Sequence, residues 1–249
     1  MNPVLILTHN CLEMTKRCVE SVLRQDIPTE VCTIDNGSND GTDLWSYKNA
    51  YRWASFNHNA GVSKGWNIGL QLLLEDFPRD HALCLNNDTV LPPYFYRELL
   101  SYDVPFVTGV SSNDPQLTEH PPARCALVGH PDFSAFLIRR EAWEKIGPFD
   151  EGMKLYAQDC DYHVRACKAG VPLLAANLPF YHERSSTLRL ASPEERQEIE
   201  MQANADREYF RRKWGFAVGS AEYQQATSSR SGTPVPFPGE IRNSEETHT

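Results

Sequence analysis

Residues 81–95 read HALCLNNDTVLPPYF, an apolar run that ends abruptly in two carboxamides and a carboxylate. The apolar part has the composition of a buried strand. Burial of its polar end, formed by Asn86, Asn87 and Asp88, costs free energy unless a charged or hydrogen-bonding group lies beside it. One explanation is an Asx-type turn before the two prolines that follow. The other is a ligand bound at the end of a central strand.

The residues before this stretch alternate short apolar runs with amphipathic ones. The alternation predicts strands over residues 3–8, 31–35, 51–57 and 82–86, with helices over residues 11–25, 41–49 and 61–76. Strands that alternate with helices form an α/β fold with a mainly parallel central sheet flanked by helices. In such sheets, ligands bind outside the carboxyl ends of the strands.

Polar clusters fall at all four predicted strand ends. They cover residues 8–10, 35–38, 57–59 and 86–88. Because the carboxyl ends of parallel strands lie at one edge of a sheet, we expect the clusters to converge on one rim. The cluster at residues 35–38 has two explanations, namely a well-formed β-to-α turn and a carboxylate that accepts the N–H of a nucleotide base.

Three glycines, at positions 61, 65 and 69, are spaced four residues apart in the third predicted helix. They lack the G-x-G pattern of a dinucleotide fingerprint. We expect Gly69 to allow close packing of the helix on the sheet. Asn59, Gly61 and Asn67 are expected to reach a nucleotide from the start of this helix, where free N–H groups favour anions. The apolar residues expected to face inward are Ile68, Leu72 and Leu73.

The second half of the chain is less regular and more helical. Its pattern predicts strands over residues 104–111 and 132–140, and helices over residues 141–147, 157–170 and 193–215. From about residue 220 the chain is rich in Ser, Thr, Pro and Glu and poor in apolar residues. This composition predicts a mobile tail over residues 220–249.

Two aspartates, Asp159 and Asp161, begin the helix predicted over residues 157–170. Residues two apart on a helix point to different faces, so only one of them can face the rim. We assign Asp159 inward as a general base and Asp161 to a structural contact with Arg165. The alternative is that both are ordinary helix-start residues, which the helix dipole favours.

Composition excludes several classes of protein. The net charge of −9 argues against a general binder of nucleic acid or anionic membranes. The seven cysteines contain no C-x-x-C pair, and we expect them to be reduced. The chain opens on neither a basic leader nor an apolar run of about 18 residues. We therefore expect a cytoplasmic protein without a transmembrane segment, and surface attachment to a membrane stays open.

These motifs, taken in order, resemble those of the large inverting glycosyltransferase family 2, which has the GT-A fold. The resemblance runs from VLILTHN through TIDNGSNDGT, NAGVSKGWNIG, LNNDT and GPFDE to QDCDYHVRACKAG and YHERSS, over roughly residues 3 to 185. It implies a Rossmann-like sheet with a helical C-terminal part. It also implies transfer of a sugar from a nucleotide-diphospho-sugar to an acceptor hydroxyl with inversion, dependent on Mn²⁺ or Mg²⁺.

The resemblance also assigns roles to individual residues. Asp159 matches the catalytic base. Asp88 matches the last aspartate of the D-x-D motif, in a subgroup that reads N-N-D, and carboxylates are preferred ligands of Mg²⁺ and Mn²⁺. His182 is the second candidate metal ligand, or else a hydrogen-bonded structural histidine. The residues expected to bind the nucleotide-sugar are Thr8, Asn10, Asp35, Asn59, Gly61, Asn67, Asn86 and Asn87. One departure is Gln158, which replaces the usual glutamate before the base.

The resemblance divides the chain into a nucleotide-sugar-binding half, residues 1–110, and an acceptor-binding and catalytic-base half, residues 111–215. The donor expected is a UDP- or dTDP-sugar, and the acceptor is a glycan, glycolipid or protein. A catalytically silent nucleotide-sugar-binding or scaffold protein is the alternative. A nucleotidyltransferase is disfavoured because no glycine-rich loop follows the first strand, and an aspartyl phosphatase because D-x-D-x-T is missing.

Overall fold

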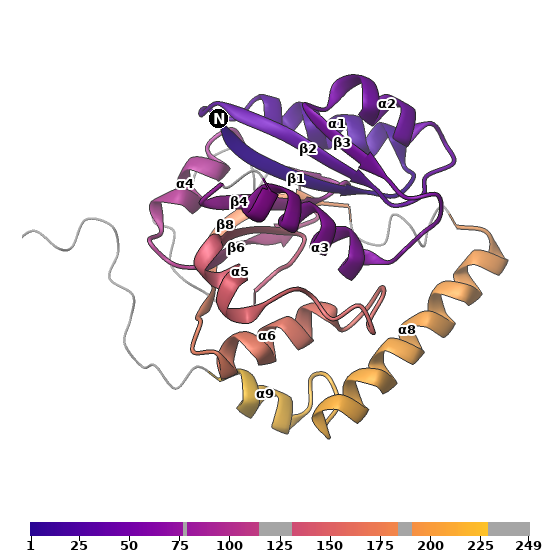
Figure 1. Cartoon of the computed structure of the whole chain (residues 1–249), viewed down its shortest axis with the longest axis vertical. Coiled ribbons are helices and arrows are strands. Elements are labelled where there is room, and N and C mark those ends of the chain that lie inside the picture. Colours follow the sequence, from indigo (N-terminus) through magenta and orange to yellow (C-terminus); the bar gives the residue numbers. More distant parts are fainter. Residues whose placement is uncertain (77–78, 115–130, 184–190, 229–249) are drawn as a thin grey trace, which may run out of the picture.

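One eight-stranded mixed sheet forms the centre of the structure, with the strand order β3-β2-β1-β4-β7-β6-β8-β5 (Figure 1). The coordinates are a computed structural model of the 249-residue chain and describe residues 1–76, 79–114, 131–183 and 191–228. The strands are β1 (Asn2–Thr8), β2 (Thr29–Asp35), β3 (Arg52–Ser55), β4 (His81–Asn86), β5 (Thr89–Val90), β6 (Phe106–Ser112), β7 (Ala135–Arg139) and β8 (Leu173–His182).

Strands β1 to β4 run parallel, so their carboxyl ends share one edge of the sheet. Thr8 of β1 pairs with Asp35 of β2, and Leu7 pairs with Asn86 of β4. Strand β7 runs antiparallel to β4, and its first residues therefore return to the edge where β4 ends. The backbone N–H of Asn86 donates to the carbonyl of Ser134 there, at 3.0 Å. The predicted α/β fold is confirmed.

Helices cover both faces of the sheet. They are α1 (Leu12–Leu23), α2 (Thr42–Asn49), α3 (Val62–Gln71) with a π-helical extension (Leu72–Asp76), α4 (Phe95–Ser101), α5 (Arg140–Ile146), α6 (Gln158–Lys168), α8 (Pro193–Trp214) and α9 (Ala221–Thr227). Val4 and Ile6 of β1 pack with α1 and α4 on one face. Leu5 and Leu7 pack with α3, α5 and α6 on the other. A strand buried on both faces has to be apolar throughout, which explains the uninterrupted VLIL run.

Helix α3 lies unusually close to β1 because two of its residues lack side chains. A Cβ added to Gly69 would lie 2.4 Å from Leu5 Cδ1, and one added to Gly65 would lie 2.3 Å from Leu7 Cδ1. The predicted packing role of Gly69 is confirmed. The expected inward position of Ile68 is wrong, since its side chain is 38% exposed. The side of α3 that packs on the sheet instead carries Trp66, two residues earlier in the helix.

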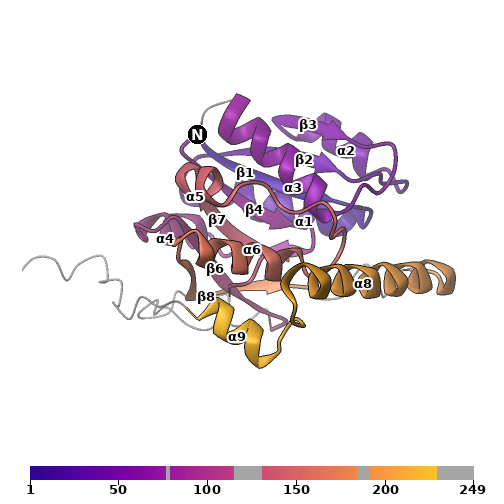
Figure 2. The same cartoon turned by 60° about the horizontal axis from the view of Figure 1, so that its bottom comes forward.

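The C-terminal helices extend the fold beyond the sheet. Helix α8 begins at a capping box. The Ser192 hydroxyl accepts the backbone N–H of Glu195, and the Glu195 carboxylate accepts the backbone N–H of Ser192. Its first half projects away from the body, and its second half lies beside α6 and α9 (Figure 2). Helix α9 occupies residues 221–227, where the sequence predicts the start of a tail. Residues 229–249 of that predicted tail lie outside the described residues.

Candidate active site

The loops after β1, β2 and β4 are joined by hydrogen bonds at the carboxyl edge of the sheet. Asn10 adopts a left-handed backbone conformation, and its backbone N–H donates to Ser38 Oγ at 2.7 Å. Its side-chain Oδ1 accepts the backbone N–H of Asn39 at 2.9 Å. Asn87 Nδ2 donates to the Asn10 carbonyl and to Thr15 Oγ1, each at 2.9 Å. Asn10 and Asn87 therefore fix three loops relative to one another.

The loop after β3 joins the same network. Asn36 Nδ2 donates to Asn59 Oδ1 at 2.9 Å, and Asn36 Oδ1 accepts the N–H of Ala60 at 2.8 Å. Asn59 Oδ1 also accepts the N–H of Gly61 at 3.0 Å. The four polar clusters singled out in the sequence thus meet on one rim, as predicted.

Asp35 is fully buried at the centre of this rim. One carboxylate oxygen accepts from Thr8 Oγ1 at 2.9 Å and from Ser38 Oγ at 2.6 Å, and the other accepts from the Ser38 N–H at 2.9 Å. A carboxylate with three such donors organises the turn after β2. Its expected contact with a nucleotide base stays a prediction.

Asn67 and Gly61 attach α3 to the segment before α6. Asn67 Nδ2 donates to the Phe149 carbonyl at 2.9 Å and to Glu151 Oε1 at 3.0 Å, while its Oδ1 accepts the Phe149 N–H at 2.7 Å. A Cβ on Gly61 would meet Lys154 at 3.0 Å, and the first N–H of α3 donates to the Lys154 carbonyl at 2.6 Å. Because these polar groups have protein partners, both residues hold the frame of the rim in this structure.

Asp88 and His182 lie together although they are far apart in the chain. Their carboxylate Oδ1 and ring Nε2 are 3.2 Å apart, and both side chains are largely buried. The antiparallel pairing of β5 with β8 aligns Thr89 with His182 and so fixes this approach. The ring Nδ1 of His182 is buried and has no hydrogen-bond partner among the described residues.

This pair fits a divalent cation only in part. Within the described ranges, no group of three or more His, Cys, Asp or Glu side chains gathers around a point where a metal could bind. Mg²⁺ and Mn²⁺ sites commonly use one or two protein side chains and take their remaining ligands from substrate phosphates and water. Asp88 and His182 supply a hard oxygen and an imidazole nitrogen, which such a site can use.

A cavity of about 400 Å³ opens beside the end of β4. It contains Asn86 and Asp159, which are two of the predicted site residues, and neither Asp35 nor Asp88 lines it. Its other lining residues are Val62, Trp66, Pro131, Asp132, Phe133, Ser134, Phe149, Leu155 and Gln158. A partly apolar cavity of this size with a few polar groups is typical of a small-molecule site.

Asp159 stands in the first turn of α6 and faces this cavity. Burial raises the pKa of its carboxyl, the backbone N–H of Cys160 at 2.8 Å opposes that rise, and the nearby Asp132 carboxylate adds to it. A carboxylate whose proton affinity is raised in this way is a stronger base than one in water.

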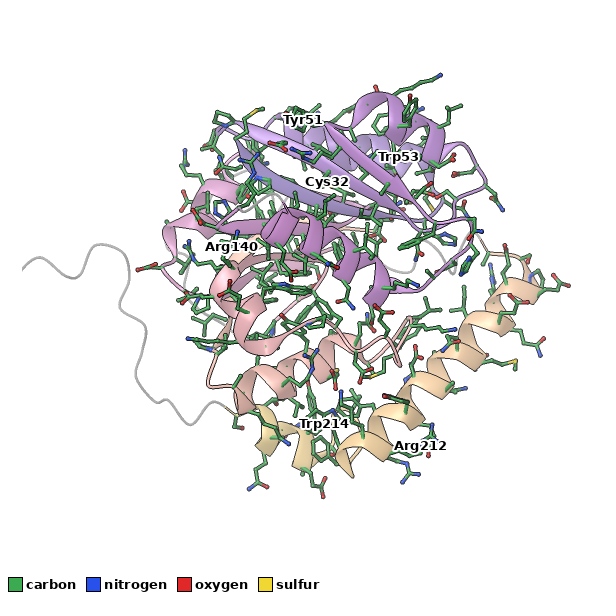
Figure 3. The ribbon with its side chains drawn as sticks, viewed as in Figure 1. Cys32, Tyr51, Trp53, Arg140, Arg212 and Trp214 are labelled. Atoms are coloured by element: carbon green, nitrogen blue, oxygen red, sulfur yellow. The ribbon has the colours of Figure 1, made fainter. Side chains whose placement is uncertain are left out.

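Asp161 faces away from the cavity, into the protein. Its carboxylate accepts from Arg165 Nε at 2.8 Å and from Trp214 Nε1 at 2.9 Å, and Lys213 Nζ lies 2.7 Å away. Figure 3 shows Trp214 at the end of α8 nearest α6, with Arg212 on the outer side. The predicted pairing of Asp161 with Arg165 is confirmed.

Helix α8 supports the segment that carries Asp159, which the sequence did not reveal. Its buried Asp206 accepts the backbone N–H groups of Leu155 at 2.7 Å and Tyr156 at 2.9 Å. Gln202 Nε2 donates to the other oxygen of Asp206 at 2.7 Å. Since Leu155 lines the cavity and Asp159 follows it closely, Asp206 fixes one wall of the site.

Asp132, Ser134 and Gln158 are the polar lining residues whose place in the site the sequence did not predict. Asp132 precedes β7, and only the antiparallel pairing of β7 with β4 brings it beside Asn86. The Oε1 atom of Gln158 is buried without a hydrogen-bond partner among the described residues. The one available signal was the unusual glutamine before the base.

None of the helices in the described part of the chain is both long and apolar enough to cross a membrane.

Comparisons with known proteins agree with this arrangement. The family model "Glycosyl transferase family 2" matches residues 4–103. No curated protein matches the sequence. Among solved structures, GalNAc-T7 with UDP, GalNAc and Mn²⁺ is similar over 73% of this chain and 43% of its own, at 16% identity and a TM-score of 0.57.

Two further structures show the same likeness. S. aureus TarS 1-349 in complex with UDP-GlcNAc is similar over 91% of this chain and 78% of its own, at 16% identity and a TM-score of 0.55. The mannosyltransferase PcManGT from Pyrobaculum calidifontis, in complex with GDP-Man and Mn²⁺, is similar over 75% of this chain and 59% of its own, at 16% identity and a TM-score of 0.51.

This chain spans less than half the length of the GalNAc-T7 chain and 47% of a longer TarS chain. At 16% identity these likenesses establish the fold. The chain therefore has the GT-A fold of glycosyltransferases, and its residues 4–103 match the pattern of glycosyl transferase family 2.

Proposed function

We propose that this protein transfers a sugar from a nucleotide-diphospho-sugar to an acceptor hydroxyl, with inversion at the anomeric carbon and with Asp159 as the general base. The observation that carries the proposal is that Asp159 faces the same cavity as Asn86, the residue that leads from β4 to Asp88. The GT-A fold and the family match over residues 4–103 support it.

The reaction needs a base on the side of the sugar opposite the leaving group. The acceptor hydroxyl lies against Asp159, and its oxygen attacks the anomeric carbon while the bond from that carbon to the diphosphate oxygen breaks. The nucleoside diphosphate leaves with the bonding electron pair, and Asp159 takes the hydroxyl proton. A positioned base of this kind contributes roughly 10²- to 10⁴-fold to the rate.

We infer that Asp88 and His182 hold a divalent cation, Mn²⁺ or Mg²⁺, together with the diphosphate of the donor. The cation would neutralise the negative charge that grows on the leaving diphosphate. The short distance between the two side chains supports this role. The Mn²⁺ in the structures of GalNAc-T7 and PcManGT supports it further.

The donor proposed is a UDP- or dTDP-sugar, bound across residues 1–110, with the acceptor bound by residues 111–215. TarS with UDP-GlcNAc and GalNAc-T7 with UDP support a uridine nucleotide. Thr8, Asn10, Asp35, Asn59 and Asn87 form the proposed nucleotide side of the rim, either by contact or by holding the loops in place. The six described cysteines are free thiols, which supports a cytoplasmic location. Cys125 lies outside the described residues.

A thermal-shift screen of nucleotide-sugars with and without Mn²⁺ tests the proposal, since a ligand that binds only the folded state raises the melting temperature. We expect one nucleotide-sugar to stabilise the protein only when Mn²⁺ is present, and to be hydrolysed slowly in the absence of an acceptor. Stabilisation without hydrolysis would favour the silent nucleotide-sugar-binding protein. No stabilisation by any donor would contradict both functions.

A further inference from the structure

Asp132 places a second carboxylate in the cavity that contains the proposed base. Its Oδ1 accepts the backbone N–H of Ser134 at 2.9 Å, and its own N–H donates to Thr108 Oγ1 at 3.1 Å. These bonds hold the residue at the start of β7. No hydrogen bond to its Oδ2 is found among the described residues, and the side chain lines the cavity.

The chemistry of the cavity wall favours an uncharged ligand that is rich in hydroxyl groups. Of its described lining residues, two are carboxylates and none is basic. A phosphate would therefore meet repulsion here. The buried Gln158 Oε1 has no hydrogen-bond donor among the described residues. A ligand hydroxyl can donate a hydrogen bond to a carboxylate or carboxamide oxygen. Trp66 and Phe149 supply apolar surface for the C–H groups of such a ligand.

The position of Asp132 within the cavity indicates which part of a substrate it meets. Ser134, to which it is bonded, accepts the N–H of Asn86 at the end of β4. The electrostatic influence of Asp132 also reaches Asp159. Asp132 thus lines the same cavity as the strand end proposed to lead to the diphosphate and as the proposed base. In a sugar-nucleotide, the group between those two points is the transferred sugar.

We propose that Asp132 is a specificity-determining residue that accepts a hydrogen bond from a hydroxyl of the transferred sugar, with Gln158 as a second acceptor on the same ligand. This inference rests on the proposed glycosyl transfer and names the group that recognises the sugar rather than the nucleotide. Hydrogen bonds to charged groups are stronger than those between neutral groups, so Asp132 contributes more than Gln158.

Calorimetric titrations in the presence of Mn²⁺ test the proposal with two probe pairs, UDP with UDP-GlcNAc and dTDP with dTDP-glucose. The proteins are the wild type, Asp132→Asn and Asp132→Ser, because Asn and Ser both keep an acceptor for the Ser134 N–H. For the pair that the wild type binds, we expect both variants to bind the nucleotide-sugar about tenfold more weakly, which corresponds to about 1.4 kcal/mol. In both variants, the affinity for the bare nucleotide should stay within about twofold of the wild-type value.

Asp103→Asn serves as the matched control, since it removes an exposed carboxylate before β6 that is not among the cavity lining. It should leave both affinities unchanged. Unchanged nucleotide-sugar affinity in both Asp132 variants, or an equal loss for bare nucleotide and nucleotide-sugar, overturns the role of Asp132. A wild type that binds none of the four probes instead contradicts the proposed function, so the two failures are distinguishable.

Discussion

The ring Nε2 of His182 lies 3.2 Å from the carboxylate Oδ1 of Asp88. Asp88 precedes β5 and His182 ends β8, and the short pairing of these two strands brings the residues together. Neither residue is close to the other in sequence, and each alone has an ordinary structural explanation. Their contact is the observation behind the proposal that the two residues share a cation.

Replacing either member of this pair should remove the metal dependence of donor binding. In Asp88→Ala and in His182→Ala, the cation would lose one of two protein ligands, and ligands are what set the affinity of such sites. We expect Mn²⁺ to raise the affinity of the wild type for UDP and to have little effect on Asp88→Ala. Calorimetry with and without Mn²⁺ measures this difference.

His182→Phe provides the matched control for the histidine, because the ring keeps approximate size and shape and has no atom that binds a cation. It should resemble His182→Ala in metal dependence. If His182→Phe retains the full Mn²⁺ effect, the histidine is a structural partner of Asp88 and not a ligand.

Asp159→Asn should separate catalysis from stability. The substitution keeps an acceptor for the Cys160 N–H and removes the base, so transfer or donor hydrolysis should fall by roughly 10²- to 10⁴-fold while donor affinity stays nearly constant. The folded-state pKa of Asp159 is raised, so its ionised form destabilises the fold at pH above that value. Asp159→Asn should therefore melt at a higher temperature than the wild type at pH 7. A variant with undiminished turnover refutes the assignment.

The raised pKa of Asp159 also predicts how activity depends on pH. A protonated carboxyl cannot accept a proton, so activity is lost as the pH falls through the folded-state pKa, which lies above the ordinary aspartate value of about 3.9. The negative charge of Asp132 contributes to the rise. In Asp132→Asn the acid limb of the pH–rate profile should move to lower pH. A limb that moves to higher pH, or does not move, contradicts this electrostatic link.

Asp206→Ala should loosen the wall of the site from a distance. One oxygen of the carboxylate accepts the two backbone N–H groups and the other accepts the Gln202 amide, and alanine has no acceptor for any of them. A buried donor left unpaired costs about 1–3 kcal/mol, so urea denaturation should show a loss of that size. Glu208→Gln, on the exposed side of the same helix, is the control and should leave stability essentially unchanged.

Gly69→Ala tests the contact between α3 and β1. The added methyl would lie 2.4 Å from Leu5 Cδ1, and overpacking of this kind costs typically about 1–3 kcal/mol. Ile68→Ala, one residue away and partly exposed, should cost less. The free energies of unfolding of the two variants compare directly. A stabilised Gly69→Ala would show that the helix can move away from the strand at no cost.

The sequence alone predicted the elements that are buried along their whole length, because such burial leaves a continuous apolar pattern. The apolar run of β1 and the rim clusters at residues 8–10 and 86–88 follow from a parallel sheet covered on both faces. Elements with weak or interrupted patterns were missed, including α4 and β8, whose ten residues contain Asn177 and Pro179. Strand β5 has two residues, and α9 is a seven-residue helix in a polar stretch that packs through Tyr223.

The composition of the site depends on contacts between residues far apart in the chain, which no local pattern records. Asp132 enters the cavity only because β7 returns antiparallel beside β4. Asp206 acts through backbone groups fifty or more residues earlier, and a lone aspartate in a charged helix gives no sign of this. Helix geometry predicted that Asp159 and Asp161 face different sides, and the resemblance to family 2 indicated which of them is the base.

Titration of the wild-type protein with UDP-GlcNAc and with UDP, each with and without Mn²⁺, followed by the same titrations of Asp88→Ala, tests the central claim most directly. The account predicts binding that Mn²⁺ strengthens in the wild type and an affinity in Asp88→Ala that no longer depends on Mn²⁺. Binding of equal strength with and without Mn²⁺ in the wild type, or an Mn²⁺ effect that persists in Asp88→Ala, would contradict it.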